Sequence, residues 1–303
     1  MRQPPSTTPG PARTRTLAAF ALLVVMPAAA PGQQAGPAAP APRSAPVAPP
    51  QPARLAEQAR RLFESALGHQ REGRRRQAER DYRRLLGLSP SAYPALMNLA
   101  LLLQAEGRLR EAEEFYRRAA ASDPKNPQPP TQLSTLYLSL GRRGAAAEQA
   151  RRALALDPRS AQARFALASV HVAEGRLADA EREFRTAVEL APTNPQAHLN
   201  LGVVLARRNR PSEALVMLER AARLDPSLAQ AHLYAGAMWH ALGEYRNAAA
   251  ACRRAAELSP RDPSVHFNLG LALQMESHRT GDAKLAEQAE AAYRRAISLQ
   301  PTS

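Results

Sequence analysis

The chain has 303 residues, of which 45% are hydrophobic and 5% aromatic, and it carries a formal net charge of +14. Its many alanines and few aromatic residues favour closely packed helices and disfavour a β-sandwich or barrel. Cys252 is the single cysteine, which excludes disulfide-stapled folds and cysteine-based metal sites. Only Lys125 and Lys284 among the 41 basic residues are lysines. GC-rich codons explain such a bias toward arginine, which lowers the value of the charge as a functional clue.

The N-terminal segment has the pattern of an export signal. Arg2, Arg13 and Arg15 precede an uncharged apolar run over residues 17–26, and three alanines follow at 28–30. The run falls short of the roughly 20 residues that a membrane-spanning helix needs. We therefore predict a signal peptide over residues 1–32, with an uncleaved N-terminal anchor as the alternative, and a periplasmic or secreted protein. Membrane contact is expected only through this segment, if it is uncleaved.

Residues 33–52 are rich in proline and alanine, and seven of these twenty residues are proline. Such a composition cannot bury enough apolar surface to fold. We predict a disordered linker over residues 33–52, which tethers the rest of the chain.

A 34-residue repeat dominates the remaining sequence. Prolines recur with this constant spacing at positions 90, 124, 158, 192, 226 and 260, and an alanine stands twelve residues before each of them. Small or apolar residues also recur five and eight residues before the proline. This spacing places them on one face of a helix that ends just before the proline. Seventeen residues before each proline stands a glycine, or once Asn209, and both types tolerate a left-handed backbone. Each unit is thus predicted to be helix, turn, helix.

These residues resemble the tetratricopeptide repeat, which has a Leu-small pair in its first helix and an Ala, aromatic, Ala, Pro series in its second. The resemblance implies an all-α, right-handed superhelical solenoid over residues 53–303. Its seven repeats span 59–92, 93–126, 127–160, 161–194, 195–228, 229–262 and 263–303. The last repeat has seven extra residues, which we place in a stretched turn over residues 278–284. Two other departures, Ser65-Ala66 in the first repeat and Pro129-Pro130 in the third, concern local helix starts.

No catalytic, nucleotide-binding or metal-binding motif is found, so we expect no enzyme and no cofactor. His198, His232 and His266 recur at one position of three successive repeats, but the intervening helices hold them too far apart to share one metal, and we interpret them as packing residues. Cys252 stands where other repeats carry Tyr or Phe, and is predicted to be buried. Arginine pairs recur near the ends of the second helices, and glutamates four residues earlier indicate a solvated, ion-paired face.

The first helices point to a binding surface. At 100° per residue, several residues lie away from the core stripe, and in the resembled family that face lines the concave groove. The asparagines partly resemble the ladder with which O-linked N-acetylglucosamine transferases hold an extended peptide, although Ala166 and Tyr234 interrupt it. Contact with the next repeat alone is the other interpretation of these residues. The predicted peptide groove consists of Phe63, Met97, Asn98, Leu101, Gln132, Phe165, Leu199, Asn200, Val203, Leu233, Tyr234, Phe267, Asn268 and Leu271.

We accordingly predict an exported, non-catalytic scaffold that binds an extended peptide or a partner helix in this groove. One alternative is a binder of anionic polymers through an arginine ridge; another is a recognition or regulatory subunit of an enzyme such as a glycosyltransferase. Nucleic acid is not expected, because no aromatic residues are interleaved with the arginines. Tyr293, Ile297 and Leu299 lie in the last repeat without a following helix to cover them, so self-association through that end is also predicted.

Overall fold

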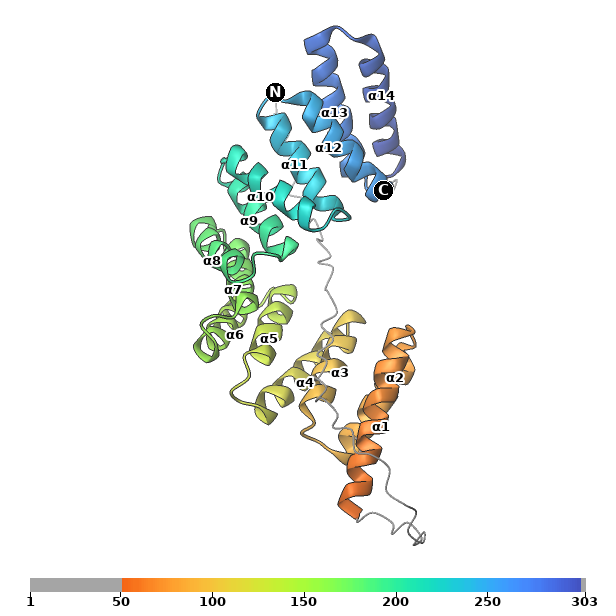
Figure 1. Ribbon diagram of the computed structural model, residues 1–303, viewed down its shortest axis with the longest axis vertical. Coiled ribbons are helices and arrows are strands. Elements are labelled where there is room, and N and C mark those ends of the chain that lie inside the picture. The colour runs from red at the N-terminus through yellow and green to blue at the C-terminus, as the bar shows by residue number, and fades with distance from the viewer. Residues whose placement is uncertain (1–50, 301–303) are drawn as a thin grey trace, which may run out of the picture. The chain divides into compact units, whose positions relative to one another are not determined.

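A computed structural model of the protein describes residues 51–300, which form fourteen α-helices and no β-strand (Figure 1). The predicted signal peptide, and all of the predicted linker except its last two residues, lie outside the described residues. Within the described range, no helix is both long enough and apolar enough to cross a membrane. The all-α prediction is confirmed for this part of the chain.

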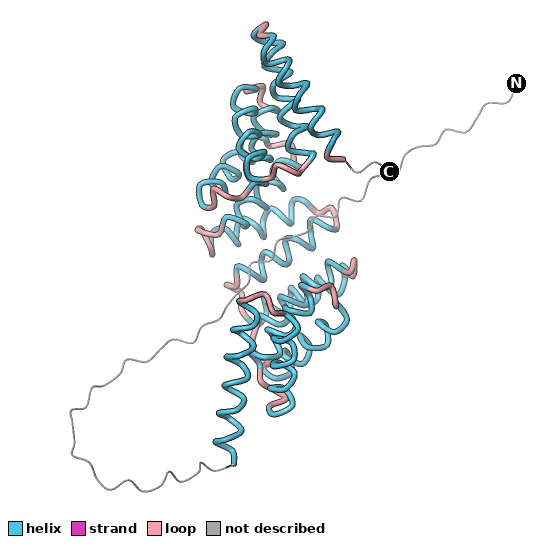
Figure 2. Tube along the Cα trace, turned by 90° about the vertical axis from the view of Figure 1, so that its right-hand side faces the viewer, coloured by secondary structure: helices cyan, strands magenta, loops and turns pink. Residues whose placement is uncertain are grey.

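The helices pack as seven antiparallel pairs in chain order, each pair against the next (Figures 1 and 2). The pairs are α1 (Gln51–Arg71) with α2 (Arg75–Leu88), α3 (Tyr93–Ala105) with α4 (Leu109–Ser122), α5 (Gln128–Ser139) with α6 (Arg143–Leu156), α7 (Ala161–Ala173) with α8 (Leu177–Leu190), α9 (Pro195–Arg207) with α10 (Pro211–Leu224), α11 (Ala229–Ala241) with α12 (Tyr245–Leu258), and α13 (Pro263–Thr280) with α14 (Ala283–Ser298). Six of the pairs lie within one predicted repeat each, whereas in the first pair α1 begins at Gln51, ahead of the predicted start at residue 59. Odd-numbered helices are therefore first helices, and even-numbered helices are second helices.

The turn inside each pair depends on a left-handed residue. The glycines at positions 73, 107, 141, 175 and 243 have φ between 72° and 80°, and Asn209 takes the same role with φ 58°. The residue after this turn donates its N–H to a carbonyl of the first helix, as Arg108 does to Leu103 at 2.9 Å. This bond satisfies a carbonyl at the helix end, which explains the recurrence of glycine or asparagine there. The turn predicted from the repeat pattern is confirmed.

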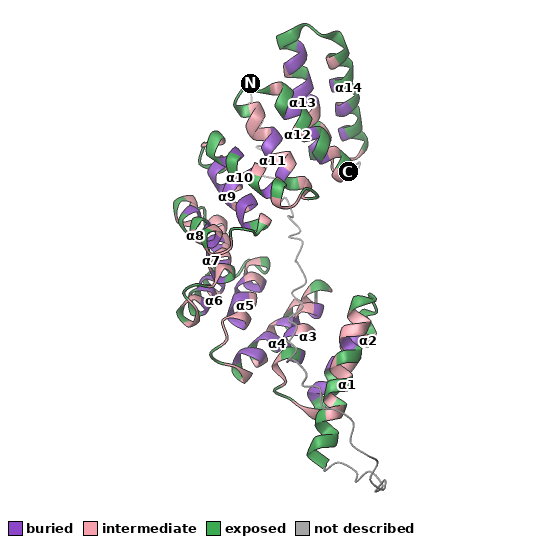
Figure 3. Cartoon of the chain, in the orientation of Figure 1, coloured by how far each residue is buried: buried purple, intermediate pink, exposed green. Residues whose placement is uncertain are grey.

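The core lies between the two helices of each repeat, where a small residue of the first helix receives a larger side chain of the second. Tyr82, Tyr116 and Phe184 are at most 1% exposed. At Gly236 the fit is tight, because a Cβ there would lie 2.5 Å from Cys252 Sγ. Figure 3 shows buried residues along the helix faces that meet a neighbour and exposed residues on the opposite faces. Cys252 is 1% exposed, as predicted.

Two local expectations, the linker's end and the stretched turn of the last repeat, are corrected. Helix α1 begins at Gln51, so Pro52 belongs to its first turn and not to the linker, because a first-turn proline lacks only an N–H that would have no helical partner. Pro129 and Pro130 likewise lie in the first turn of α5. The stretched turn is wrong: the helix continues through His278 to Thr280, so α13 has 18 residues, against 13 in α11, and the turn is only Gly281 and Asp282.

Candidate functional site

First helices form the inner side of the stack. The first helices of neighbouring repeats touch one another in three places, α5 with α7, α9 with α11, and α11 with α13, and no two second helices of the described repeats pack together comparably. Elements that approach each other across repeats lie at the smaller radius of a curved stack. The surface of the first helices is therefore the inner face, where the predicted groove residues are found.

The three groove asparagines adopt one common arrangement. Asn98, Asn200 and Asn268 each donate an Nδ2 hydrogen to the carbonyl four residues earlier, at 2.8, 2.7 and 2.8 Å. Each is half-buried. This bond fixes the side chain against its own helix and leaves the Oδ1 acceptor and the second N–H unused by it. The amides are thus held ready for an external donor and acceptor. Gln132, in the same register, is also half-buried.

Three phenylalanines on the inner face pack in tilted or edge-on contact with an aromatic residue of the second helix. The ring centroids are 6.1 Å apart for Phe63 and Tyr82, 5.3 Å for Phe165 and Phe184, and 5.8 Å for Phe267 and Tyr293. Phe267 is 53% exposed, whereas the other two are half-buried. These rings therefore belong partly to the core and partly to the inner surface.

Two predicted groove residues are not available to a ligand. Met97 is 8% and Leu199 is 2% exposed, and both belong to the buried core. A residue one position from the core stripe is turned by only 100°, and that direction faces the neighbouring repeat, whose helices cover it. For these two, the interpretation as contacts with the next repeat is the correct one. The remaining groove residues Leu101, Val203, Leu233, Tyr234 and Leu271 are half-buried.

Charge is strongly segregated between the two kinds of helix. The first helices α3, α5, α7, α9 and α11 contain only two charged residues, Arg164 and Arg207. Arg164 pairs with Glu183 at 2.9 Å, and Arg207 ends its helix. Every second helix, by contrast, carries several arginines or glutamates on its exposed side. From α3 to α11 the inner face is therefore nearly neutral, although the chain as a whole is strongly basic. The first helices at the two ends differ, since α1 carries six charged residues and α13 carries Glu276 and Arg279.

The outer charges form ion pairs within and between repeats. Four of the five glutamates predicted to pair with the arginine four residues later do so, with Glu113 and Arg117 at 2.7 Å, and Glu148 is the exception. The four are Glu79, Glu113, Glu114 and Glu181. A second set joins a glutamate of one second helix to the arginine that follows the turn of the next repeat: Glu79 to Arg108 at 2.7 Å, Glu113 to Arg142 at 3.0 Å, and Glu181 to Arg210 at 2.8 Å. Hydrogen bonds from Arg108 lower the pKa of Glu79 and bring that of Glu111 to about 2. These contacts engage part of the outer arginines, whereas Arg84, Arg151 and Arg152 form no ion pair within residues 51–300, so the outer face is partly ion-paired.

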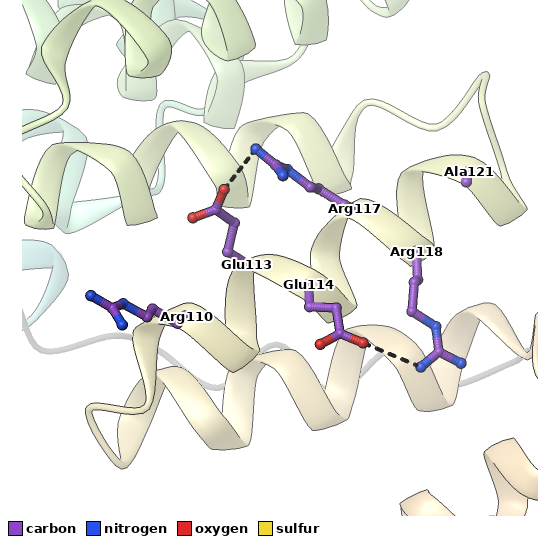
Figure 4. Close-up of a pocket in the computed structure, with 6 residues that line it drawn as sticks. All are labelled: Arg110, Glu113, Glu114, Arg117, Arg118 and Ala121. Atoms are coloured by element: carbon purple, nitrogen blue, oxygen red, sulfur yellow. Dashed lines mark ion pairs between the residues drawn. The ribbon is translucent and has the colours of Figure 1, made fainter.

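A hollow of about 370 Å³ lies on the outer side of α4 (Figure 4). Only this helix lines it, with Arg110, Glu113, Glu114, Arg117, Arg118 and Ala121. Figure 4 shows Glu113 directed at Arg117 and Glu114 at Arg118, at 2.7 and 4.0 Å. Because four of its five charged side chains are engaged with one another and no second helix encloses it, this hollow is an open helix surface and not a ligand cavity.

The repeated histidines hold the loops between repeats. His198 and His266 place Nε2 at 3.0 Å from the carbonyl oxygens of Pro192 and Pro260, and His232 lies 3.3 Å from that of Pro226. Arg164 occupies the same register and donates to Pro158. Residues 51–300 gather no group of three side chains suited to a metal ion. The sequence pattern indicated packing, but the bond to the repeat proline was not predicted.

A family model for the tetratricopeptide repeat matches residues 63–127, 131–195, 165–229 and 199–263, together more than half of the chain. The chain belongs to the tetratricopeptide-repeat family. No curated protein shows significant similarity to this tetratricopeptide-repeat protein.

Solved structures share the fold at low sequence identity. YrrB, described as a TPR protein with an unusual peptide-binding site, is 22% identical, with a TM-score of 0.51 over 61% of this chain and 92% of its own. PilF of Pseudomonas aeruginosa is 21% identical, with a TM-score of 0.61 over 70% of this chain and 96% of its own. A chain of the APC/C hetero-tetramer Cut9-Hcn1 is 18% identical, with a TM-score of 0.64 over 74% of this chain and 46% of its own. At these identities the likeness concerns the fold alone.

Proposed function

We propose that this tetratricopeptide-repeat protein is a non-catalytic scaffold that holds an extended segment of a partner protein along its inner face. The observation that carries the proposal is the shared arrangement of Asn98, Asn200 and Asn268, each fixed by its own helix with an unused acceptor. A backbone in extended conformation presents N–H and C=O groups that such amides can satisfy. The peptide-binding site for which YrrB is described supports this use of the fold.

The test replaces the three asparagines by alanine in the full chain and measures binding to an array of 12-residue peptides. We expect the captured peptides to bind about fivefold more weakly for each hydrogen bond lost, since one bond contributes roughly 1 kcal/mol. Far-ultraviolet circular dichroism should be unchanged, because the three side chains bond only within their own helices. The matched control changes the outer arginines Arg253 and Arg254 to alanine. If only that variant loses binding, and only in low salt, the protein binds anionic partners through its outer face.

Export remains part of the proposal, on the basis of the charged start, the short apolar run and the alanines that follow it. Cell fractionation with N-terminal sequencing tests it. A mature protein recovered outside the cytoplasm, beginning near residue 33, is the expected result. An intact Met1 on a protein confined to the cytosol would contradict export without affecting the proposed peptide binding.

A further inference from the structure

The near absence of charge on the five first helices from α3 to α11 points to the chemistry of the bound segment. We infer that this segment is uncharged and extended, built from small and apolar residues, and held through its backbone by a column of glutamines; the inference rests on the proposed function. The chain is strongly basic, yet α5 and α11 contain no charged residue at all, and Arg164 in α7 is already paired with Glu183.

The glutamine column consists of Gln128, Gln162, Gln196 and Gln230, which recur at one position of successive repeats, at the start of α5, α7, α9 and α11. Gln162, Gln196 and Gln230 are exposed, and Gln128 accepts a hydrogen bond from the Tyr93 hydroxyl at 3.0 Å. Each lies four residues before the asparagine register, so the two registers share one side of the helix. Asn200 Nδ2 bonds the backbone carbonyl of Gln196, which places the two side chains in adjacent turns. Together they present donors and acceptors without charge.

The spacing of this column suits an extended backbone. Helices in contact, as α9 and α11 are, lie roughly 8–10 Å apart. A polyproline II segment advances about 3.1 Å per residue and completes a turn in three residues, so its peptide groups return to the same side every ~9 Å. Gln128 with Gln162, on α5 and α7, and Gln196 with Gln230, on α9 and α11, can therefore each meet the same side of the segment in two successive repeats. The half-buried Phe165 and Leu233 contribute apolar contact between these amides.

Charged side chains in the bound segment would be disfavoured on this face. A charge taken from water onto it meets amides and apolar groups but no opposite charge, and burying an unpaired charge is unfavourable. Attraction to the outer arginines acts at a distance and is screened by salt, so it does not hold an acidic segment on the inner face. A neutral segment has no charge to remove from water, so it avoids this unfavourable free energy, and its binding should depend little on ionic strength.

The test selects 12-residue peptides from a random phage-displayed library on the immobilised full chain. Selection is repeated on the variant Gln162→Ala, Gln196→Ala, Gln230→Ala and on an outer-face control, Arg84→Ala, Arg151→Ala, Arg220→Ala. The informative peptides are those that the control variant retains and the glutamine variant does not. We expect them to carry fewer than half as many charged residues as the unselected library. Their affinities should change less than twofold between 50 and 500 mM NaCl.

Three other outcomes would refute the inference, and they differ in their consequence for the proposed function. Peptides that depend on the glutamines but are rich in acidic or basic residues would refute the neutral partner and leave peptide binding on the inner face intact. Peptides that depend on neither the glutamines nor the groove asparagines would refute both the inference and the proposed function. A fall in the sedimentation mass of the full chain on changing the glutamines would show that a second copy occupies the face, and would also refute the inference.

Discussion

Adding a methyl group at Gly236 should expose the tight packing of the sixth repeat. In the structure, a Cβ at this position would lie 2.5 Å from Cys252 Sγ and 3.2 Å from the Ala248 carbonyl oxygen. Cys252 is 1% exposed, so its sulfur cannot move into solvent without opening the contact between α11 and α12. Overpacking of this kind costs roughly 1–3 kcal/mol, whereas replacing glycine by alanine in a helix gains up to about 1 kcal/mol. We therefore expect Gly236→Ala to destabilise the repeat by up to about 2 kcal/mol.

A double-mutant cycle separates the two effects. In a Cys252→Ala background the sulfur is gone, so Gly236→Ala should become neutral or stabilising, with a coupling of about 2 kcal/mol between the sites. Gly68→Ala in α1 is the matched control, because a Cβ there meets nothing within 4 Å and only the helix preference should act. Trp239 is the single tryptophan and packs beside both neighbouring core clusters, so its fluorescence during urea unfolding reports this repeat directly. Additive effects of the two changes, or a stabilising Gly236→Ala by itself, would refute the packing argument.

Three further predictions concern the thiol, the outer ion pairs and the last repeat. Burial raises the pKa of Cys252 to about 12, so the native thiol should not react with iodoacetamide at pH 8 and should react once urea unfolds the chain. An unfolded thiol ionises near pH ~8.5, so the contribution of Cys252 to the free energy of unfolding is present below that pH and declines above it. Glu79, Glu113 and Glu181 each pair with an arginine of the next repeat, but the equivalent position in the third repeat is Ala147, whose matching arginine is Arg176. Ala147→Glu should therefore raise the free energy of unfolding in urea by about 0.5 kcal/mol at low salt. A gain that persists in 1 M NaCl would speak against an ion pair. Ile297 and Phe267 are 69% and 53% exposed, so Ile297→Glu should reduce any concentration-dependent increase in mass seen by light scattering; an equal increase in both proteins would exclude this patch as the contact.

Much of the architecture follows from local sequence. The repeat period predicts seven helix pairs because each repeat needs the same small residues at its helix contact and a left-handed residue at its turn. Asn209 shows how far this extends, since its φ of 58° matches the role of the glycines at the same position in other repeats. The inserted residues of the last repeat were placed wrongly in the turn, because helix continuation through Thr280 depends on contacts with α14.

The inner face is where tertiary structure decided most. Helical periodicity by itself places Leu199 and Asn200 together on the side away from the core stripe, but the stacked neighbouring repeats bury the first and leave the second half-exposed. A helical wheel describes one helix, whereas burial in a solenoid depends on two neighbours at an angle that the repeat's own sequence does not reveal. The same holds for charge: the sequence determined a net charge of +14 and its repeating arginine pairs. Only the packing of the first helices at the inner side showed that the inner face is nearly free of this charge from α3 to α11.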